Sequence, residues 1–123
     1  MSRILCVDDN KDANDLTGIV LQKLGRVVTT VSTIAEAALL LNINNYHLYV
    51  LDWQLDELDG VDLCRTIRRT NKEVPIIIYS GHAHASDLAN GKEAGATLYL
   101  TKPDGIDAIV GIVDEFLSEK EIT

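Results

Sequence analysis

Polar side chains of the kinds that handle phosphate stand at the ends of apolar segments in this 123-residue chain. They are Asp8 and Asp9, Asp52, Ser80 and Lys102. Carboxylates that lie close together repel one another and attract a cation, and hard oxygen ligands with room for water suit Mg²⁺. A hydroxyl and an ammonium group on the far side suit a phosphoryl group. If the fold brings these residues together, they predict phosphoryl transfer onto Asp52, with this carboxylate as the nucleophile.

The apolar segments have the length and pattern of strands that would gather these residues. Five strands are predicted, over residues 3–7, 27–31, 48–52, 75–79 and 97–101. Helical patterns alternate with them, over residues 12–24, 33–41, 61–70, 87–94 and 106–117. Most of the strands are continuous apolar runs, which is typical of a parallel sheet covered on both faces. With right-handed crossovers, the pattern predicts an α/β fold with a doubly wound, five-stranded parallel sheet and helices on both faces. Ligands of such sheets bind beyond the carboxyl ends of the strands, which is where the polar residues stand.

For two of the predicted helices, the first and the third, the spacing of apolar side chains predicts which face packs against the sheet. The first helix has an apolar stripe of Ala13, Leu16, Val20 and Leu24. In the third helix Val61, Cys64 and Ile67 are expected to point inward, and Arg65, Arg68 and Arg69 mostly outward. Stripes of this spacing are the usual sign of a helix packed on one side only.

Local signals also predict where some helices begin and end. Thr33 and Glu36 have the spacing of a capping box, and residues 42–45 read as the loop after that helix. Gly25 and Gly95 each follow a helical pattern, where a glycine often ends the helix.

The charge balance limits the classes of partner. Lys and Arg number 11 and Asp and Glu 19, which gives a net charge of −8. Such a charge disfavours direct binding to nucleic acid or to anionic lipid. No apolar run approaches the length of a membrane span, and acidic residues come too early for a signal peptide. We therefore expect one cytoplasmic domain over residues 1–123, without membrane insertion. Cys6 and Cys64 lack metal-ligand spacing and are expected to be buried, reduced thiols.

The order and spacing of the motifs resemble those of the response-regulator receiver domain (CheY-like) of two-component signalling, over essentially the whole chain. The motifs are Val7-Asp8-Asp9-Asn10, Leu51-Asp52 with Asp59-Gly60 behind it, Ile77-Ile-Tyr-Ser80-Gly81, Gly95-Ala96, and Tyr99-Leu-Thr-Lys102-Pro103. Each motif is weak alone, but their common register is specific. The resemblance implies a flavodoxin-like sheet with strand order 2-1-3-4-5.

The resemblance also implies a role for each site residue. Asp52 would accept a phosphoryl group from a phosphohistidine. Asp9 would bind Mg²⁺ together with Asp52 and the backbone carbonyl of Gln54, while Asp8 holds the water shell of the metal. Ser80 and Lys102 would contact the phosphoryl group, with Ser80 and the aromatic Tyr99 acting as the switch pair. The side chains of Gln54 and His82 lie where they would tune the lifetime of the phosphoryl group.

Three positions depart from the pattern of the family. Asp56 replaces a proline that usually follows the acceptor, Asp104 replaces a frequent phenylalanine, and His47 replaces an acidic residue. Asp104 removes an apolar anchor beside the partner surface. None of the three belongs to the residues expected to handle phosphate.

The expected function is a phosphorylation-dependent signalling switch, and not an enzyme beyond slow self-dephosphorylation. The expected partners are a sensor histidine kinase or histidine phosphotransfer protein and a downstream protein target. A receiver module of a hybrid kinase or phosphorelay is an alternative. An aspartate-nucleophile phosphatase would need a second acid two residues after Asp52, where Gln54 stands. A flavin-binding protein would need a Ser-, Thr- or Gly-rich loop after the first strand, and the sequence has acidic residues there.

Overall fold

A five-stranded parallel sheet forms the centre of the molecule in the computed structural model, which describes residues 2–23, 25–52, 54–55, 58–81, 85–101 and 105–122. Its strands are β1 (Arg3–Val7), β2 (Val27–Val31), β3 (Leu48–Leu51), β6 (Ile76–Ser80) and β7 (Leu98–Thr101). They lie in the order β2-β1-β3-β6-β7. Since β6 and β7 are the fourth and fifth strands of this sheet, the predicted order 2-1-3-4-5 is confirmed.

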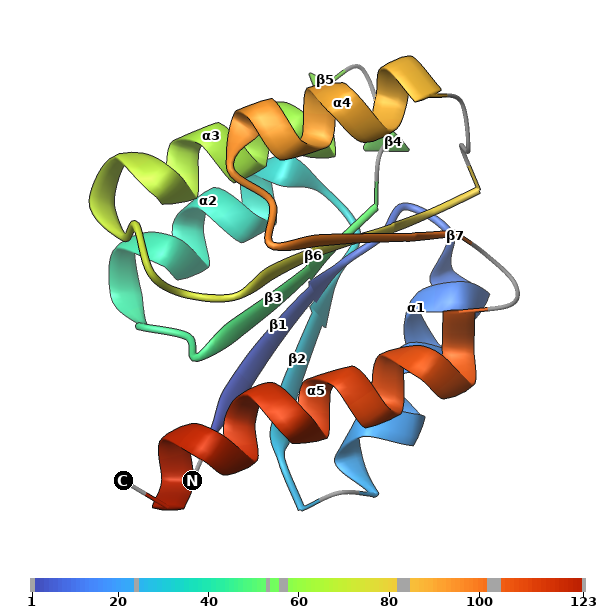
Figure 1. Ribbon diagram of the computed structural model, residues 1–123, viewed down its shortest axis with the longest axis vertical. Coiled ribbons are helices and arrows are strands. Elements are labelled where there is room, and N and C mark those ends of the chain that lie inside the picture. The colour runs from blue at the N-terminus through green and yellow to red at the C-terminus, as the bar shows by residue number, and fades with distance from the viewer. Residues whose placement is uncertain are drawn as a thin grey trace.

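Helices cover both faces of the sheet, as predicted. They are α1 (Lys11–Gln22), α2 (Ile34–Ile43), α3 (Gly60–Thr70), α4 (Ala85–Ala94) and α5 (Gly105–Ile122). Figure 1 shows α2, α3 and α4 on one side of the sheet and α1 and α5 on the other. Within the described residues, no helix has the length and apolar content needed to cross a membrane.

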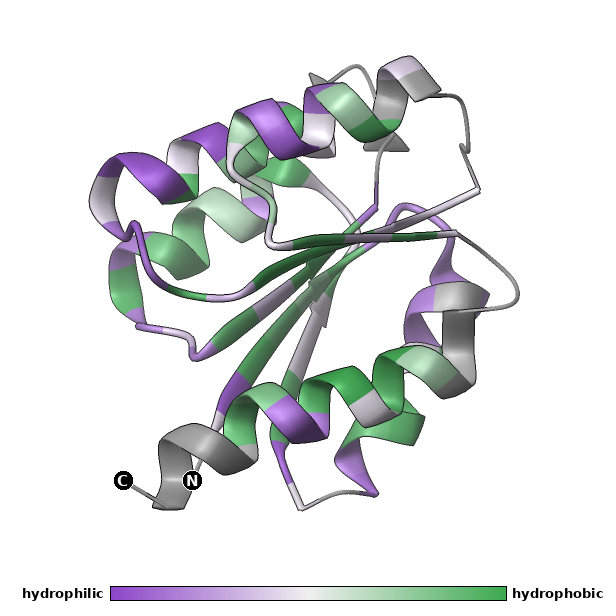
Figure 2. Cartoon of the chain, viewed as in Figure 1, coloured by the Kyte–Doolittle hydropathy of each residue, from purple (hydrophilic) through white to green (hydrophobic). Residues whose placement is uncertain are grey.

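The alternation of side chains along each strand builds a core on both faces of the sheet. Leu5, Leu51 and Ile78 belong to the layer under α2, α3 and α4, whereas Ile4 and Ile77 belong to the layer under α1 and α5. All five side chains are fully buried, and the strands appear apolar along most of their length in Figure 2. The strands are therefore continuous apolar runs because their side chains are buried on both faces of the sheet.

Several local predictions are confirmed. The backbone N–H of Glu36 donates to Thr33 Oγ1 at 3.1 Å, so the capping box forms. Gly25 and Gly95 have φ angles of 77° and 105°, which glycine adopts more readily than other residues. Cys6 and Cys64 are buried free thiols. In α3, Val61, Cys64 and Ile67 face the core as expected.

The predicted apolar stripe of α1 is wrong at Leu16, whose side chain is 55% exposed. The face of α1 that meets the sheet instead contains Asn14, Thr17 and Leu21, all buried. Gly18 lies on the same face, because a methyl group there would meet Thr30 Cγ2 at 3.0 Å. Small and polar residues thus replace an apolar stripe where the helix comes close to the strand.

Two other segments differ from the prediction. The helix α2 continues to Ile43, so residues 42 and 43 are helical and the predicted loop is shorter. The turn after Asp52 contains a short antiparallel pair, β4 (Gln54–Leu55) and β5 (Leu58–Asp59). Two-residue strands carry too little periodicity to be recognised in a sequence.

Arg68 corrects the prediction that the arginines of α3 point to solvent. Its side chain is half-buried and donates to the carbonyls of Gly95 at 2.8 Å, Val74 at 2.7 Å and Asn71 at 3.2 Å. It also donates to Thr97 Oγ1 at 3.3 Å. One guanidinium therefore ties the end of α3 to the start of β6 and to the segment between α4 and β7. Arg65 and Arg69 are exposed, as predicted.

Candidate functional site

The register of β1 and β3 places two of the predicted site carboxylates side by side. Val7 pairs with Leu51, and Asp8 and Asp52 are the next residues of the two strands. The N–H of Asp52 donates to the carbonyl of Val7 at 2.8 Å, so the ladder continues one residue past β3. Both carboxylates therefore emerge at the same carboxyl edge of the sheet, the edge where ligands of doubly wound folds bind.

Asp9 completes a cluster of three carboxylates at this edge. One carboxylate oxygen from each of Asp8, Asp9 and Asp52 lies within 4.8 Å of the other two. Asp8 is buried, Asp52 is half-buried and Asp9 is exposed, so the cluster opens to water on one side. Three hard oxygen donors with access to solvent fit the coordination that Mg²⁺ prefers, because this ion keeps several of its waters.

Asp8 is held in place by a short-range hydrogen bond. Its Oδ1 accepts from the N–H of Asn10 at 2.9 Å, which fixes the turn that leads into α1. Asp8 also acts on the residue two positions before it on the same side of β1. Burial, and secondly the charge of Asp8, raise the pKa of the Cys6 thiol from 9.0 to about 12. Cys6 therefore stays protonated beneath the cluster at neutral pH.

Ser80 and Tyr99, the predicted switch pair, lie on one face of adjacent strands. Ser80 ends β6, is fully buried and stands opposite Thr101 in the register of β7. Tyr99 stands opposite Ile78, and side chains two residues apart in a strand share a face. Ser80 and Tyr99 are thus on the α3–α4 side of the sheet, one strand step apart.

Gly91 is a contributor to this region that the sequence interpretation missed. A methyl group at position 91 would meet Tyr99 Cδ2 at 3.1 Å and Ile78 Cδ1 at 3.2 Å. The glycine therefore lets α4 approach the Tyr99 ring closely. The available signal was a glycine in the middle of a helix that precedes an aromatic strand residue.

Some residues named in the sequence analysis, site residues among them, lie outside the described part of the chain. These are Lys102 with Pro103 and Asp104, His82, and Asp56. Gln54 is described as a backbone position of β4, but its side chain is not. The structure accordingly brings together Asp8, Asp9 and Asp52, with Ser80 at the end of the neighbouring strand.

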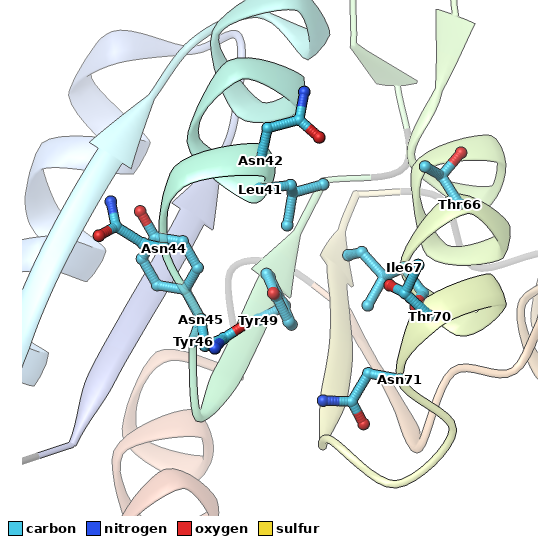
Figure 3. A pocket seen from close by; sticks show the side chains of 10 residues that line it. All are labelled: Leu41, Asn42, Asn44, Asn45, Tyr46, Tyr49, Thr66, Ile67, Thr70 and Asn71. Carbon is cyan, nitrogen blue, oxygen red and sulfur yellow. The ribbon is translucent and has the colours of Figure 1, made fainter.

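A hollow at the opposite end of the sheet has a different chemical character. It has a volume of about 210 Å³ and lies between the ends of α2 and α3, beside the start of β3 (Figure 3). Its walls contain only uncharged residues: Leu41, Asn42, Asn44, Asn45, Tyr46, Tyr49, Thr66, Ile67, Thr70 and Asn71. The rings of Tyr46 and Tyr49 are 5.7 Å apart between centroids. Burial, then the neighbouring Tyr46, raise the pKa of Tyr49 to about 12. The described residues that line this hollow include no carboxylate, imidazole or thiol that would bind a metal ion.

A doubly wound sheet with acidic residues at its carboxyl edge defines a class of fold, and comparison with known proteins specifies the family. Residues 4–114 match the family described as response regulator receiver domain. The chain belongs to this family. Receiver domains are regulators and not classical enzymes, and they bind Mg²⁺ at an acidic pocket of the kind formed here.

Individual relatives support the same conclusion. The chain is 36% identical to the alkaline phosphatase synthesis transcriptional regulatory protein SphR of Synechococcus elongatus, over 89% of this chain and 46% of SphR. It is 30% identical to the transcriptional regulatory protein GlrR of Escherichia coli, over 96% of this chain and 27% of GlrR. The chain thus spans between about a quarter and a half of these two relatives. The receiver domain of the Francisella response regulator 1452 superimposes with a TM-score of 0.88 at 30% identity, covering 98% of this chain and 99% of that one.

Proposed function

We propose that this chain is a phosphorylation-controlled binding switch in which Asp52 accepts a phosphoryl group from a phosphohistidine. The observation that carries the proposal is the cluster of Asp8, Asp9 and Asp52 at the carboxyl edge of the sheet. Asp52 is the member of the cluster that follows the central strand β3 and retains partial access to solvent. The resemblance to receiver domains assigns the acceptor role to Asp52, and its partial exposure leaves it accessible to an incoming donor.

The transfer step follows from this placement. A carboxylate oxygen of Asp52 attacks the phosphorus, the new P–O bond forms and the P–N bond to the imidazole breaks. The electron pair of that bond stays on the imidazole nitrogen, which takes up a proton. Bound Mg²⁺ would supply positive charge against the phosphoryl oxygens.

Other residues of the chain have assigned roles in the proposal. Asp9 and the Gln54 carbonyl would hold the metal with Asp52, and Asp8 would hold its water. The hydroxyl of Ser80 and the ammonium of Lys102, which directly follows Thr101 in β7, would contact the phosphoryl oxygens. The side chains of Gln54 and His82 would set the rate of the slow self-dephosphorylation by admitting or blocking water.

Transmission to a partner is proposed to run through Tyr99. The Tyr99 ring packs against α4 at Gly91 and lines a surface hollow of about 340 Å³ between α4 and β7. Movement of Ser80 toward a phosphoryl group would free space on the face that Tyr99 shares with it. A turn of the ring would then reshape the hollow, which is the surface offered to a downstream protein.

The partners, the location and the extent of the domain are part of the same proposal. A sensor histidine kinase or a histidine phosphotransfer protein would be the donor, and a protein would be the target. The cytoplasm is the expected compartment, and residues 1–123 are expected to form a single receiver domain, whether it acts alone or within a hybrid kinase or phosphorelay.

The acceptor is tested by trapping the acyl phosphate. The protein is incubated with Mg²⁺ and acetyl phosphate and then reduced with borohydride, which converts an aspartyl phosphate into homoserine. We expect tandem mass spectrometry of the peptides to place homoserine at position 52. Homoserine at position 8 or 9 instead would contradict the assignment of the acceptor.

The role of Tyr99 is tested separately. Phosphorylation-dependent binding to the cognate target is compared for the native protein and Tyr99→Ala, with phosphoryl uptake measured in parallel. We expect Tyr99→Ala to be phosphorylated normally and to bind the target much more weakly. Unchanged binding would show that the signal does not pass through Tyr99.

A further inference from the structure

Exposed apolar side chains are concentrated on the elements at one edge of the sheet, and the hollow beside the end of β2 at this edge is also lined by Asp9 of the site described above. The described residues include six large hydrophobic side chains that are exposed, and five of them lie on α1, β2 and α2. These are Leu16, Ile19, Val27, Leu39 and Ile43; the sixth is Leu88 on α4. Scattered exposed apolar residues are ordinary, whereas a contiguous group marks an interaction surface.

Helical periodicity places three of these side chains on the sides of α1 and α2 that also carry Asp15 and Glu36, while the fourth, Val27, lies on β2 itself. Asp15 and Glu36 line a hollow of about 250 Å³ together with Thr30 and Ser32, so both acidic residues lie beside the end of β2. Ile19 is four residues after Asp15 in α1, and Leu39 and Ile43 are three and seven residues after Glu36 in α2. Residues with these spacings share one side of a helix. We call the group of Ile19, Val27, Leu39 and Ile43 the β2-edge surface.

The strand at this edge lacks the charges and the proline that often protect the edge of a sheet. β2 is the terminal strand of the sheet, and its sequence Val-Val-Thr-Thr-Val contains no charged residue. Exposed edges usually carry charges, proline or a bulge that prevent pairing with another chain. Apolar residues also run along most of α2 beside it, as Figure 2 shows. An uncharged strip of this kind allows the close approach of another molecule despite the net charge of −8.

The charges at the two ends of the surface indicate what that molecule is. Asp15, Ile19 and Lys23 follow one another at four-residue spacing on α1, and Asp15 and Lys23 are both exposed. The middle of this stripe lies level with the middle of β2, because Gly18 contacts the side chains of Val28 and Thr30. Along the direction of β2, this stripe of α1 thus presents an acidic, an apolar and a basic side chain in succession. A second copy rotated by a half turn about its centre presents base, apolar, acid.

We infer that the β2-edge surface is a self-complementary interface that joins two copies of this chain in a symmetric dimer. Ile19 meets its own counterpart near the two-fold axis, and Asp15 of each copy faces Lys23 of the other. Leu39 and Ile43 of the two α2 helices cover one another on the other side of the strands. A two-fold axis requires the same patch on both copies. The charge pattern of this patch is self-complementary, because a half turn brings its acidic end opposite its basic end. The inference goes beyond the proposed function, since it requires no phosphoryl group.

Sedimentation velocity over a wide range of protein concentrations tests the inference on the full chain without phosphodonor. We expect a reversible monomer–dimer equilibrium. Ile43→Lys, at a side chain that is 74% exposed, should raise the dimer dissociation constant by about tenfold or more, because it would place a charge in an apolar contact of the interface. Leu88→Lys is the matched control at the other edge of the sheet, and should change the constant by less than about twofold. A native protein that stays monomeric at every concentration, or an equal effect of the two variants, would overturn the inference.

A charge exchange tests the orientation of the two copies. Asp15→Lys or Lys23→Asp alone places like charges opposite each other and should weaken the dimer. The double variant carrying both substitutions restores opposite charges and should recover most of the native affinity. Failure of the double variant to recover would overturn the antiparallel arrangement. Uptake of phosphoryl groups from acetyl phosphate is measured on the same variants, so failure of the proposed function would be seen independently of dimerisation.

Discussion

The two ends of the central sheet satisfy their polar groups in opposite ways. At the carboxyl edge, Asp8, Asp9 and Asp52 gather three like charges within 4.8 Å. At the amino end, the guanidinium of Arg68 donates to three backbone carbonyls, those of Asn71, Val74 and Gly95. These acceptors therefore have their hydrogen-bond donor within the chain. The first arrangement calls for a cation from outside, whereas the second needs nothing further. We therefore expect substitutions at the carboxyl edge to remove chemistry and spare folding, and substitutions at the amino end to do the reverse.

Asp9→Asn should weaken the metal site at the carboxyl edge. Removal of one of three carboxylate ligands should weaken Mg²⁺ binding by at least about tenfold, in the range known for loss of groups that support a metal. Unfolding in urea without metal should show equal or slightly higher stability, by about 0.5 kcal/mol, because one like charge is gone. Isothermal titration with Mg²⁺ and chemical denaturation measure the two quantities. A loss of stability with unchanged Mg²⁺ affinity would contradict the comparison.

Ser80→Ala should slow phosphorylation while leaving the protein folded. Loss of one hydrogen-bond donor to a phosphoryl group that gains charge during transfer should reduce the rate of uptake by about a hundredfold, as loss of an oxyanion donor does in enzymes. Ser80→Thr keeps the hydroxyl and serves as the control, with a much smaller reduction expected. The rate is measured by mass spectrometry during incubation with acetyl phosphate. Equal rates for Ala and the native serine would show that the hydroxyl does not contact the phosphoryl group.

Arg68→Met should show the reverse behaviour at the amino end. The substitution keeps an apolar stem but leaves several carbonyls without their charged donor, which should lower the free energy of unfolding by about 2 kcal/mol. Arg69→Met, one position away on the exposed side of α3, should change it by less than about 0.5 kcal/mol. Phosphoryl uptake should be native in both variants below their unfolding transitions. Similar stabilities of the two variants would mean that the guanidinium of Arg68 is not a structural tie.

Alkaline pH should lower the free energy of unfolding through the buried thiol of Cys6, which lies beneath the carboxyl-edge cluster. The pKa of Cys6 is raised from 9.0 to about 12 by burial, so the unfolded chain loses this proton first. Its contribution to stability is complete below pH 9 and is lost as the pH rises toward 12. The slope is at most about 1.4 kcal/mol per pH unit for one proton. Denaturation of Cys6→Ala between pH 9 and 10 should show a shallower decline than the native protein; parallel declines would exclude Cys6 as the cause.

The sequence was sufficient to predict the sheet and the cluster of carboxylates, because those features depend on strong signals, while the strand order followed from the resemblance to receiver domains. Continuous apolar runs are a direct sign of burial on both faces, and Asp8 and Asp52 stand immediately after two such runs. The role of Arg68 could not be predicted because its partners are backbone carbonyls up to 27 residues away. Every residue has such a carbonyl, so the residue type does not indicate which of them accepts a hydrogen bond. Leu16 was misplaced because α1 approaches β2 through Gly18, a contact that apolar periodicity does not register. Burial on the sheet can thus be predicted from the sequence, whereas contacts that depend on a close approach of two backbone segments cannot.

The mass of the intact protein after incubation with Mg²⁺ and acetyl phosphate tests the central claim most directly, with Asp52→Asn treated in parallel. The account predicts that the native protein gains one phosphoryl group, that the gain requires Mg²⁺, and that Asp52→Asn gains none while it remains folded. An equal gain in the native protein and in Asp52→Asn would contradict the account, because the carboxyl-edge cluster would then not be where the phosphoryl group is accepted.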